Sequence, residues 1–409
     1  MSDTPIVVVG GGRAAASLVA AYREAGGNTA VVLLSDEPSP PYNRPPLSKG
    51  YLRGDVEAEA ALAHPAGFYE EHDVDLRLRS RVVAVDPDRR LVRLEHGGDL
   101  RYETLVVATG ATPRRLPVPG AELDGVTVFR TLADATAVRV KAATAERALV
   151  VGGSFIGAEV AASLRLRGLG VVLVEAGPRL MPALASDELS SGLLGLFREA
   201  GVEVLLGESL AELTAEARVL GGAVTASGRR VEADLAVIGI GVAPNTGFLE
   251  GSGIEVDDGV VVDESFRTSA ANVFAVGDVA RYPDPVSGRH RRIEHWSNAN
   301  AQGAHLGRRL AGSHERYDEV PVFFTQLFDL KFQVLGDTHD VDEVVLRGSV
   351  AAKRLLGFAL RSGRLVGAVL AGQEPDVVPE LQALLRSRAE PGDRDRLVDE
   401  TLRPAAAFA

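Results

Sequence analysis

The chain has 409 residues, of which 46% are hydrophobic and 24% charged, a balance typical of a globular protein with two or three domains. Its 56 acidic and 44 basic residues give a net charge of −12, which argues against general nucleic-acid binding. Because the chain has no cysteine, disulfides, cysteine-ligated metal sites and redox dithiols are excluded.

The N-terminus, MSDTPIVVVGGG, enters an apolar strand without the basic segment that opens a signal peptide. No apolar run in the chain reaches the roughly 18 residues needed to cross a bilayer. We therefore expect a cytoplasmic protein without a membrane partner.

Residues 6–37 read as an apolar strand, a glycine turn, an alanine-rich helix and a second apolar strand that ends near an acid. The turn has the spacing Gly10-x-Gly12-x-x-Ala15, which is typical of a βαβ unit that binds a dinucleotide. The glycines permit a tight turn and let the backbone approach a pyrophosphate. The N-terminus of the helix offers N–H groups and a positive dipole end to that anion.

A proline-rich segment, PPYNRPPLSKGYL, follows at residues 40–52. Proline fixes φ and removes a backbone donor, so this loop is stiff before it contacts anything. It carries two cations, Arg44 and Lys49, and its stiffness indicates that they are held in place for a purpose.

The glycine-turn pattern occurs a second time in residues 149–177, with the spacing Gly152-x-Ser154-x-x-Gly157. Between the copies, residues 81–110 read as a small antiparallel meander followed by a buried strand and a glycine turn. A single degenerate match is also compatible with a simple packing turn. Two matches in the same strand–turn–helix–strand context indicate two nucleotide sites.

Acidic residues follow two later strands. Glu175 ends the second strand of the second copy, where a carboxylate accepts from ribose hydroxyls and repels a 2′-phosphate. Arg179 would favour a 2′-phosphate, but it lies past a Gly-Pro turn, so we expect NADH. The buried strand NVFAVGDVA, residues 272–280, ends at Gly277 and Asp278, where an acid serves as a helix N-cap, a ligand contact or both.

The last part of the chain begins with alternating apolar residues over 320–371, which predict an antiparallel sheet. The segment VVPELQALLRS, residues 377–387, predicts a helix. Residues 390–409 are polar and then small, and we expect them to be partly disordered.

These motifs, together with GxxPN at 241–245, FRTLADA at 129–135 and EHWSNANAQG at 294–303, resemble one family. It is the FAD-dependent pyridine nucleotide-disulfide oxidoreductase-like superfamily. Within it the chain is most similar to the ferredoxin reductase branch, which contains putidaredoxin reductase-like and dioxygenase ferredoxin reductase-like proteins and is related to apoptosis-inducing factor. One departure concerns the C-terminal part, where relatives carry a Ser-Asp pair and this chain has Thr325-Gln326.

The resemblance implies an α/β fold with two Rossmann-like dinucleotide-binding domains and an α+β C-terminal domain. Residues 1–115 and 241–318 would form a discontinuous FAD-binding domain. Residues 116–240 would form the NAD-binding domain, and residues 319–409 the C-terminal α+β domain.

The resemblance also implies roles for single residues. Lys49 would lie at the flavin N5 and O4 edge, where a cation stabilises the anionic reduced flavin. Glu159 would be its pairing carboxylate, and Trp296, the only tryptophan, would lie beside the ring. The remaining cofactor-binding residues would be Gly10, Gly12, Ala14, Asp36, Arg44, Val82, Arg130, Gly277 and Asp278 for FAD, and Gly152, Gly157, Glu175 and Gly241 for NADH.

The implied function is an NADH:ferredoxin reductase that takes hydride from NADH onto FAD and passes single electrons to a small iron–sulfur protein feeding a P450 or Rieske-type oxygenase. The alternatives are an apoptosis-inducing-factor-like flavoprotein, acting through a reduced flavin–NAD complex, and a rubredoxin reductase. Since ferredoxins are acidic, docking on this acidic chain needs a local basic patch. The densest candidate contains Arg289, Arg291 and Arg292.

Overall fold

The computed structural model describes residues 4–409, which form two compact units. Unit 1 contains the chain up to Asn43 together with Glu59–Thr112 and Ala243–Pro321. Unit 2 contains Arg44–Ala58, Pro113–Val242 and Val322–Ala409. Each unit is therefore assembled from three separate stretches of sequence.

Unit 1 is built on a parallel five-stranded sheet with the order β19-β7-β1-β2-β3. Its strands are short, β-branched and largely buried, as expected for parallel strands covered on both faces. Their bounds are β1 (Ile6–Val9), β2 (Val31–Leu34), β3 (Val74–Arg77), β7 (Thr104–Val107) and β19 (Val273–Ala275).

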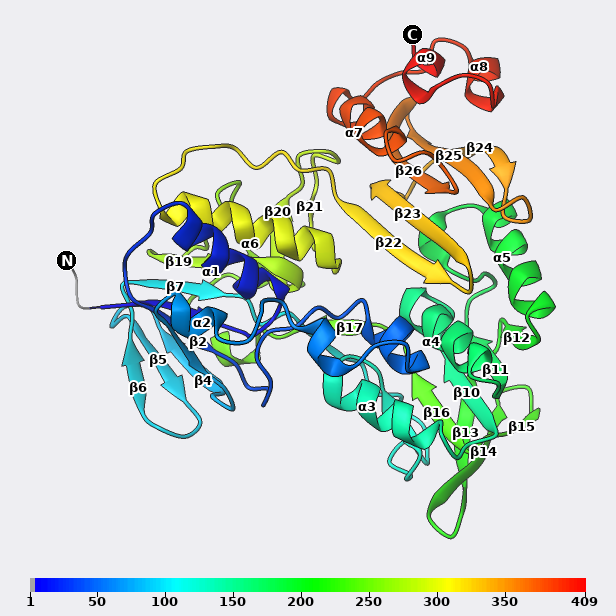
Figure 1. The fold of residues 1–409 in the computed structure, drawn as a ribbon, viewed down its shortest axis with the longest axis horizontal. Coiled ribbons are helices and arrows are strands. Elements are labelled where there is room, and N and C mark those ends of the chain that lie inside the picture. Colours follow the sequence, from blue (N-terminus) through cyan, green and yellow to red (C-terminus); the bar gives the residue numbers. More distant parts are fainter. Residues whose placement is uncertain (1–3) are drawn as a thin grey trace. The chain divides into compact units, whose positions relative to one another are not determined.

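Helix α1 (Arg13–Glu24) packs closely along α6 (Trp296–Leu310) in this unit (Figure 1). The approach depends on two glycines of α6, since a Cβ at Gly303 would lie 2.1 Å from the Ala14 carbonyl oxygen and one at Gly307 would lie 2.3 Å from that of Leu18. The smaller elements of the unit are α2 (Phe68–Glu71), the antiparallel meander β4 (Val82–Asp86), β5 (Leu91–Leu94) and β6 (Asp99–Arg101), and the sheet of β18 (Val260–Val261), β20 (Ala280–Pro283) and β21 (His290–Arg291).

Unit 2 contains a second parallel sheet of five strands, in the order β12-β11-β10-β16-β9. Its strands are β9 (Val126–Val128), β10 (Arg147–Val151), β11 (Gly170–Glu175), β12 (Val202–Leu206) and β16 (Leu235–Ile238). Its other elements are α3 (Leu132–Lys141), α4 (Phe155–Leu166), α5 (Asp187–Glu199) and the antiparallel strands β13 (Leu210–Glu216), β14 (Val219–Thr225) and β15 (Arg230–Glu232). A separate two-stranded pair is formed by β8 (Ala111–Pro113) and β17 (Val242–Pro244), and each of these strands contains a boundary between the two units.

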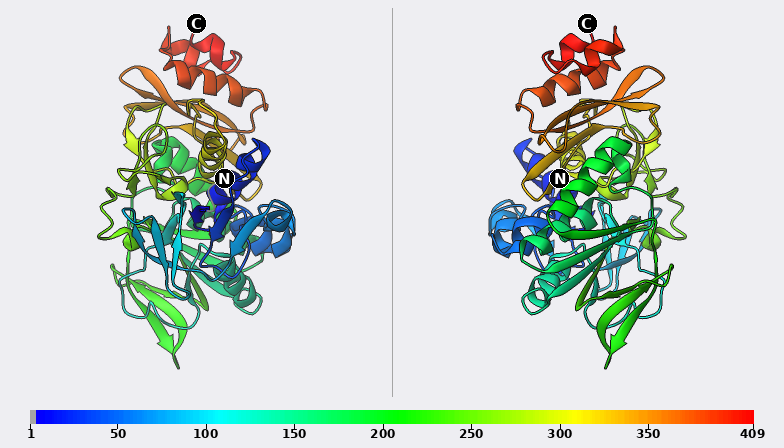
Figure 2. Two further views of the ribbon diagram at one scale, coloured as in Figure 1. Left: turned by 90° about the vertical axis from the view of Figure 1, so that its left-hand side faces the viewer. Right: turned by 90° about the vertical axis from the view of Figure 1, so that its right-hand side faces the viewer.

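The last part of unit 2 is an antiparallel sheet with the order β22-β23-β26-β25-β24, and three helices gather on one side of it (Figures 1 and 2). The strands are β22 (Val322–Leu327), β23 (Leu330–Gly336), β24 (Glu343–Ser349), β25 (Arg354–Arg361) and β26 (Arg364–Ala371), and the helices are α7 (Val377–Ser387), α8 (Arg394–Val398) and α9 (Pro404–Ala407). Two parallel α/β sheets and a C-terminal α+β part confirm the predicted fold class.

The expectation of partial disorder over residues 390–409 was wrong, because this segment forms α8 and α9. The buried guanidinium of Arg347, on β24, donates to the backbone carbonyls of Arg396, Leu397 and Leu402. These bonds hold the segment on the sheet. Over the part of the chain that the structure covers, no helix is long and apolar enough to cross a membrane.

Candidate active site

The first glycine turn lies between β1 and α1. Gly10 has a φ of +117°, and a Cβ at this position would lie 2.2 Å from the Ala108 carbonyl oxygen, so only glycine fits. Gly12 faces open space, and Ala14 is buried in the first turn of the helix. No side chain caps the N-terminus of α1. Its first N–H groups are thus available to an anion such as a pyrophosphate.

The second glycine turn repeats this arrangement between β10 and α4. Gly152 has a φ of +105°, and a Cβ there would lie 2.3 Å from the Gly239 carbonyl oxygen. A Cβ at Gly157 would lie 1.9 Å from the Gly152 carbonyl oxygen, which lets α4 sit close to the turn. Ser154 precedes α4 but its side chain makes no cap hydrogen bond.

Two other helices of unit 2 begin differently. The side chains of Thr131 and Ser186 cap α3 and α5 by accepting from backbone N–H groups of their first turns. The two helices that follow the glycine turns, α1 and α4, lack such a side-chain cap. The residues present therefore fit two dinucleotides, one at each turn.

Glu175 is fixed at the second turn by two backbone donors. Its Oε2 accepts from the Gly153 N–H at 2.6 Å and its Oε1 from the Gly177 N–H at 2.7 Å. A carboxylate has about four lone-pair sites, so both oxygens retain capacity for ribose hydroxyls. The Arg179 guanidinium forms an ion pair with the Asp187 carboxylate at 2.8 Å.

At the first turn the acidic residue is displaced by one position. Val9 pairs with Leu34 in unit 1, and Val151 pairs with Val174 in unit 2, so the residue equivalent to Glu175 is Ser35. Asp36 comes next; its side chain is 56% exposed and lies 3.3 Å from the Arg81 guanidinium. The structure thus places Asp36 at the edge of the turn rather than within it.

The end of β19 brings Gly277 and Asp278 into unit 1. Gly277 has a φ of +79°, and its N–H donates to Oε1 of the buried Gln302 at 2.8 Å. The backbone carbonyl of Asp278 accepts from Arg292 at 3.0 Å. Val82 is buried at the start of β4.

Trp296 begins α6 and is held by two polar groups of the same unit. Its Nε1 donates to Oδ1 of Asn43 at 2.8 Å, and the Arg13 guanidinium lies 5.0 Å from the ring centroid, a cation–π contact. Arg13 also donates to Oδ1 of Asn300, at 2.8 Å from Nε and at 2.6 Å from one terminal nitrogen. Burial lowers the pKa of the Arg13 guanidinium. Sequence reasoning missed Arg13 and Asn300, although Arg13 stands inside the first glycine motif and Asn300 inside EHWSNANAQG.

The proline loop leads into a helical turn at Leu47–Tyr51, and Lys49 lies at a kink within it. The Lys49 Nζ is 2.7 Å from Oε1 of Glu159, which projects from α4 and is 3% exposed. Lys49 also donates to the Pro45 carbonyl oxygen at 3.2 Å. The structure therefore brings these two predicted residues together as a largely buried ion pair.

Two hydroxyl groups complete the shell of Glu159. Ser48 donates to its Oε2 at 2.5 Å, and Thr325 donates to its Oε1 at 2.7 Å. Sequence reasoning assigned no role to either hydroxyl. Ser48 stands beside Lys49 in the quoted loop and was within reach of that reasoning. Thr325 is 166 residues from Glu159 along the chain, and no local pattern joins them.

Three other predicted residues of unit 2, Arg44, Arg130 and Gly241, each make a backbone hydrogen bond. The Arg44 carbonyl accepts from the Leu47 N–H at 2.9 Å, and the Arg130 N–H donates to Asp134 at 3.1 Å. Gly241 has a φ of +93°, and its carbonyl accepts from the Arg114 N–H. The residues predicted to bind FAD thus divide between the two units, with Arg44, Lys49 and Arg130 in unit 2.

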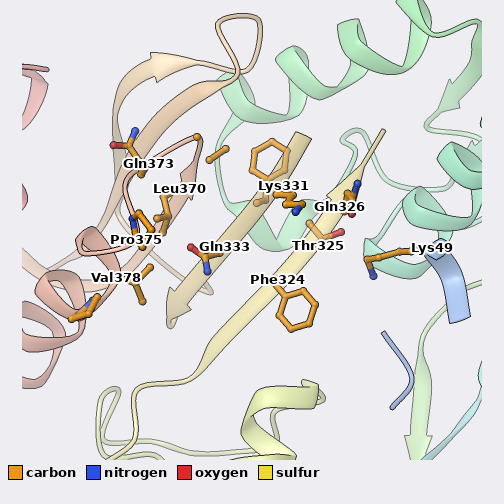
Figure 3. A pocket seen from close by; sticks show the side chains of 14 residues that line it. Lys49, Phe324, Thr325, Gln326, Lys331, Gln333, Leu370, Gln373, Pro375 and Val378 are labelled. Atoms are coloured by element: carbon orange, nitrogen blue, oxygen red, sulfur yellow. The ribbon is translucent and has the colours of Figure 1, made fainter. Parts of the chain in front are cut away.

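Lys49 and Thr325 lie at one edge of a cavity of about 830 Å³ within unit 2, and Gln373, Pro375 and Val378 lie at the opposite edge (Figure 3). Its lining is mixed, with apolar side chains, amides and a second lysine. The other lining residues are Phe324, Gln326, Lys331, Phe332, Gln333, Leu370, Ala371, Gly372 and Pro379.

The three arginines predicted to dock a partner lie in unit 1 and differ in exposure. Arg291 pairs with the buried Asp284 at 2.7 Å, and its side chain is 17% exposed. The Arg292 side chain is 9% exposed and pairs with Asp258 and Glu294. Arg289 is exposed on the same segment.

Comparison with known proteins identifies the family. Residues 4–303 match the pyridine nucleotide-disulphide oxidoreductase family, and residues 322–405 match the reductase C-terminal family. The chain belongs to the pyridine nucleotide-disulphide oxidoreductase family and is an oxidoreductase, as the sequence predicted. Membership implies FAD and NAD(H) as cofactors.

Several proteins similar to this chain are named ferredoxin reductases. Rhodocoxin reductase of Rhodococcus erythropolis is 38% identical over 81% of this chain and 78% of that protein. The ferredoxin–NAD(+) reductase subunit of the benzene 1,2-dioxygenase system of Pseudomonas putida is 35% identical over 80% of each. The crystal structure of the covalent putidaredoxin reductase–putidaredoxin complex superimposes with a TM-score of 0.95 at 29% identity, covering 100% of both chains. The predicted ferredoxin reductase branch is confirmed.

Proposed function

We propose that this chain is an FAD-dependent NADH:ferredoxin reductase that serves a P450 or Rieske-type oxygenase. In this proposal residues 1–115 and 241–318 bind FAD, residues 116–240 bind NADH, and residues 319–409 form a C-terminal domain. FAD, when bound, accepts the hydride and supplies electrons one at a time to a small iron–sulfur protein. The ferredoxin reductases among the relatives support this assignment.

The single observation that carries the chemistry is the buried pair of Lys49 and Glu159. A cation held in a site with little water stabilises negative charge that develops beside it, here at the flavin N5 and O4 edge. The Glu159 carboxylate, itself held by two hydroxyl donors, fixes the position of the Lys49 ammonium.

Nicotinamide specificity follows from Glu175. Its carboxylate is anchored by Gly153 and Gly177, so it cannot turn away from an incoming 2′-phosphate without losing both bonds. Arg179 is already paired with Asp187. The second turn, with Gly152, Gly157 and Gly241 around it, therefore favours NADH over NADPH.

We also propose contacts to FAD, which the family resemblance implies. Gly10, Gly12 and Ala14 form the pyrophosphate turn, Asp36 accepts from the adenine ribose, and Asp278, after Gly277, accepts from the ribityl chain. Trp296 lies beside the ring, where Asn43 and Arg13 fix its orientation. Further contacts come from Arg44, Val82 and Arg130.

The assay that tests this function is NADH oxidation against a panel of ferredoxins, rubredoxin, quinones and oxygen. We expect rapid turnover with a ferredoxin, measured as ferredoxin-dependent cytochrome c reduction. If no iron–sulfur protein is reduced and a long-lived charge-transfer complex with a change of oligomeric state appears instead, the apoptosis-inducing-factor-like alternative replaces this proposal. Rubredoxin as the one active acceptor would make the protein a rubredoxin reductase.

We further propose that Arg289, Arg291 and Arg292 supply the basic patch that steers an acidic ferredoxin. Arg289 is exposed, whereas Arg291 and Arg292 are mostly buried in ion pairs, so we expect Arg289 to contribute most. Arg289→Glu should raise the KM for ferredoxin at low salt and have less effect at high salt. Flavin reduction by NADH should be unchanged. Arg316→Glu, at an exposed arginine of the same unit, is the matched control. If both variants raise the KM for ferredoxin equally, the proposal that this segment docks ferredoxin is wrong.

A further inference from the structure

The carboxylate of Glu159 receives its donors in an unequal way. Its Oε1 accepts from both Lys49, at 2.7 Å, and Thr325, at 2.7 Å. Its Oε2 accepts from Ser48. Glu159 is 3% exposed, Thr325 1% and Ser48 2%, so the carboxylate and both hydroxyl donors are buried. The lysine and the threonine therefore share one oxygen.

The threonine comes from a different part of unit 2 than the other members of the cluster. Lys49 and Ser48 lie in the helical turn after the proline loop, and Glu159 lies on α4, but Thr325 lies on β22 of the C-terminal sheet. Its neighbours Phe324 and Gln326 line the cavity whose edge Lys49 also forms (Figure 3). The C-terminal sheet thus contributes a buried hydrogen-bond donor to the ion pair.

We propose that Thr325 is a positioning residue that sets how strongly Glu159 holds Lys49; this rests on the proposed function. A hydroxyl that donates to Oε1 offsets part of the negative charge that this oxygen presents to the ammonium. The lysine is then held without being fully neutralised, and its field remains available to the flavin edge. Loss of the hydroxyl concentrates charge on Oε1, which then neutralises more of the charge of the Lys49 ammonium at 2.7 Å.

The test compares Thr325→Val, which keeps the shape and removes the donor, with Thr325→Ser, which keeps the donor. Thr338→Val is the matched control, because Thr338 is a buried threonine of the same unit that donates at 2.6 Å to the Ala183 carbonyl, away from the pair. Two quantities are measured: the midpoint potential of the bound flavin, and the rate of flavin reduction by NADH in stopped flow. Thr325→Val should lower the potential and slow reduction about five- to tenfold, since a hydrogen bond to a charged group is lost.

Thr325→Ser should restore both values to near those of the unmodified enzyme, and Thr338→Val should leave both unchanged. Equal potentials in Thr325→Val and Thr338→Val, or no recovery with Thr325→Ser, would overturn the proposal. If Thr325→Val does not retain FAD, the urea unfolding of the apoprotein provides the second measurement. There the effects of Thr325→Val and Glu159→Gln on unfolding should be non-additive, and additive effects would overturn the proposal. Absence of NADH-dependent flavin reduction in the unmodified protein would instead refute the proposed function.

Discussion

The two βαβ units of this chain share a backbone plan but differ in the buried polar residue that follows the glycine turn. Ala15 in α1 and Gly157 in α4 occupy the third position of the motif, so the residue two places further is Ser17 in the first copy and Glu159 in the second. Ser17 is 5% exposed and Glu159 3%. Burying a neutral hydroxyl needs one partner, whereas burying a carboxylate needs several.

Each residue accordingly anchors a network of a different kind. Ser17 donates at 2.7 Å to Oδ1 of Asn300, which also accepts from Arg13. Glu159 accepts from two hydroxyls and pairs with Lys49. In the proposed function the shared backbone binds one dinucleotide at each turn, and the divergent buried position distinguishes the copy whose carboxylate pairs with Lys49. The same substitution at equivalent places should therefore have different consequences.

The largest difference is expected at the first glycine of each turn. Gly10→Ala and Gly152→Ala each force a Cβ within 2.3 Å of a carbonyl oxygen at a positive φ, a strain of roughly 3 kcal/mol or more. Gly10→Ala should yield protein without bound flavin. Gly152→Ala should remain yellow and lose reduction by NADH. Heat-released FAD and stopped-flow reduction measure the two outcomes.

Gly12→Ala is the matched control, because its Cβ would meet open space. Its apoprotein should unfold at the same temperature as that of the parent chain. The assignment of one dinucleotide to each turn is wrong if Gly10→Ala and Gly152→Ala both lose FAD. It is also wrong if both variants keep FAD and NADH still reduces it.

The next largest effect is expected only in the second copy, the βαβ unit that contains Glu159. Lys49→Met should retain FAD, lower the flavin potential and slow reduction by NADH about 100-fold, the scale of losing one preorganised charge stabiliser. Glu159→Gln should slow the same step. The double variant should be no slower than the more impaired single one, because the two groups share one interaction. Additive effects in stopped flow would show that the residues act separately.

A smaller effect is expected at the ends of the second strands, where Glu175 in one copy corresponds to Ser35 in the other. The unmodified enzyme should prefer NADH to NADPH by about tenfold or more in kcat/KM, and Glu175→Ala should narrow that ratio. Ser35→Ala is the control and should leave the ratio unchanged. Equal use of both nucleotides by the unmodified enzyme would mean that Glu175 does not face the ribose 2′ group.

The sequence predicted those features that depend on neighbouring residues. Both glycine turns, the parallel strands beside them and the meander of β4–β6 follow from spacing and apolar pattern within about 30 residues, the length of one βαβ unit. The family resemblance supplied the pairing of Lys49 with Glu159. Their contact joins two parts of the chain that no local pattern connects.

Features that depend on long-range contacts were not predictable in this way. Thr325 reaches Glu159 across 166 residues, and its hydroxyl resembles any other on an alternating strand until the sheet is folded. The C-terminal segment lacks an apolar pattern, and its order comes from three carbonyls bound by Arg347. The strand register, which depends on pairing between distant strands, places Ser35 at the position equivalent to Glu175, one residue before Asp36.

The smallest predicted effect is in the first copy, at the Arg13 guanidinium that contacts Asn300 and Trp296, and it is measured through the tryptophan. Trp296 is the only tryptophan of the chain, so its emission reports directly on the contact with Arg13. Arg13→Met removes the guanidinium and keeps much of the apolar stem, so the ring loses its cation–π partner while Asn43 still accepts from Nε1. In the apoprotein, we expect altered emission and greater quenching by acrylamide. The affinity for FAD should fall about two- to fivefold, which corresponds to the 0.5–1 kcal/mol of such a contact. Arg89→Met, at an exposed arginine of the same unit, should change neither quantity. Unchanged emission in Arg13→Met would show that the Arg13 guanidinium does not fix the orientation of the Trp296 ring.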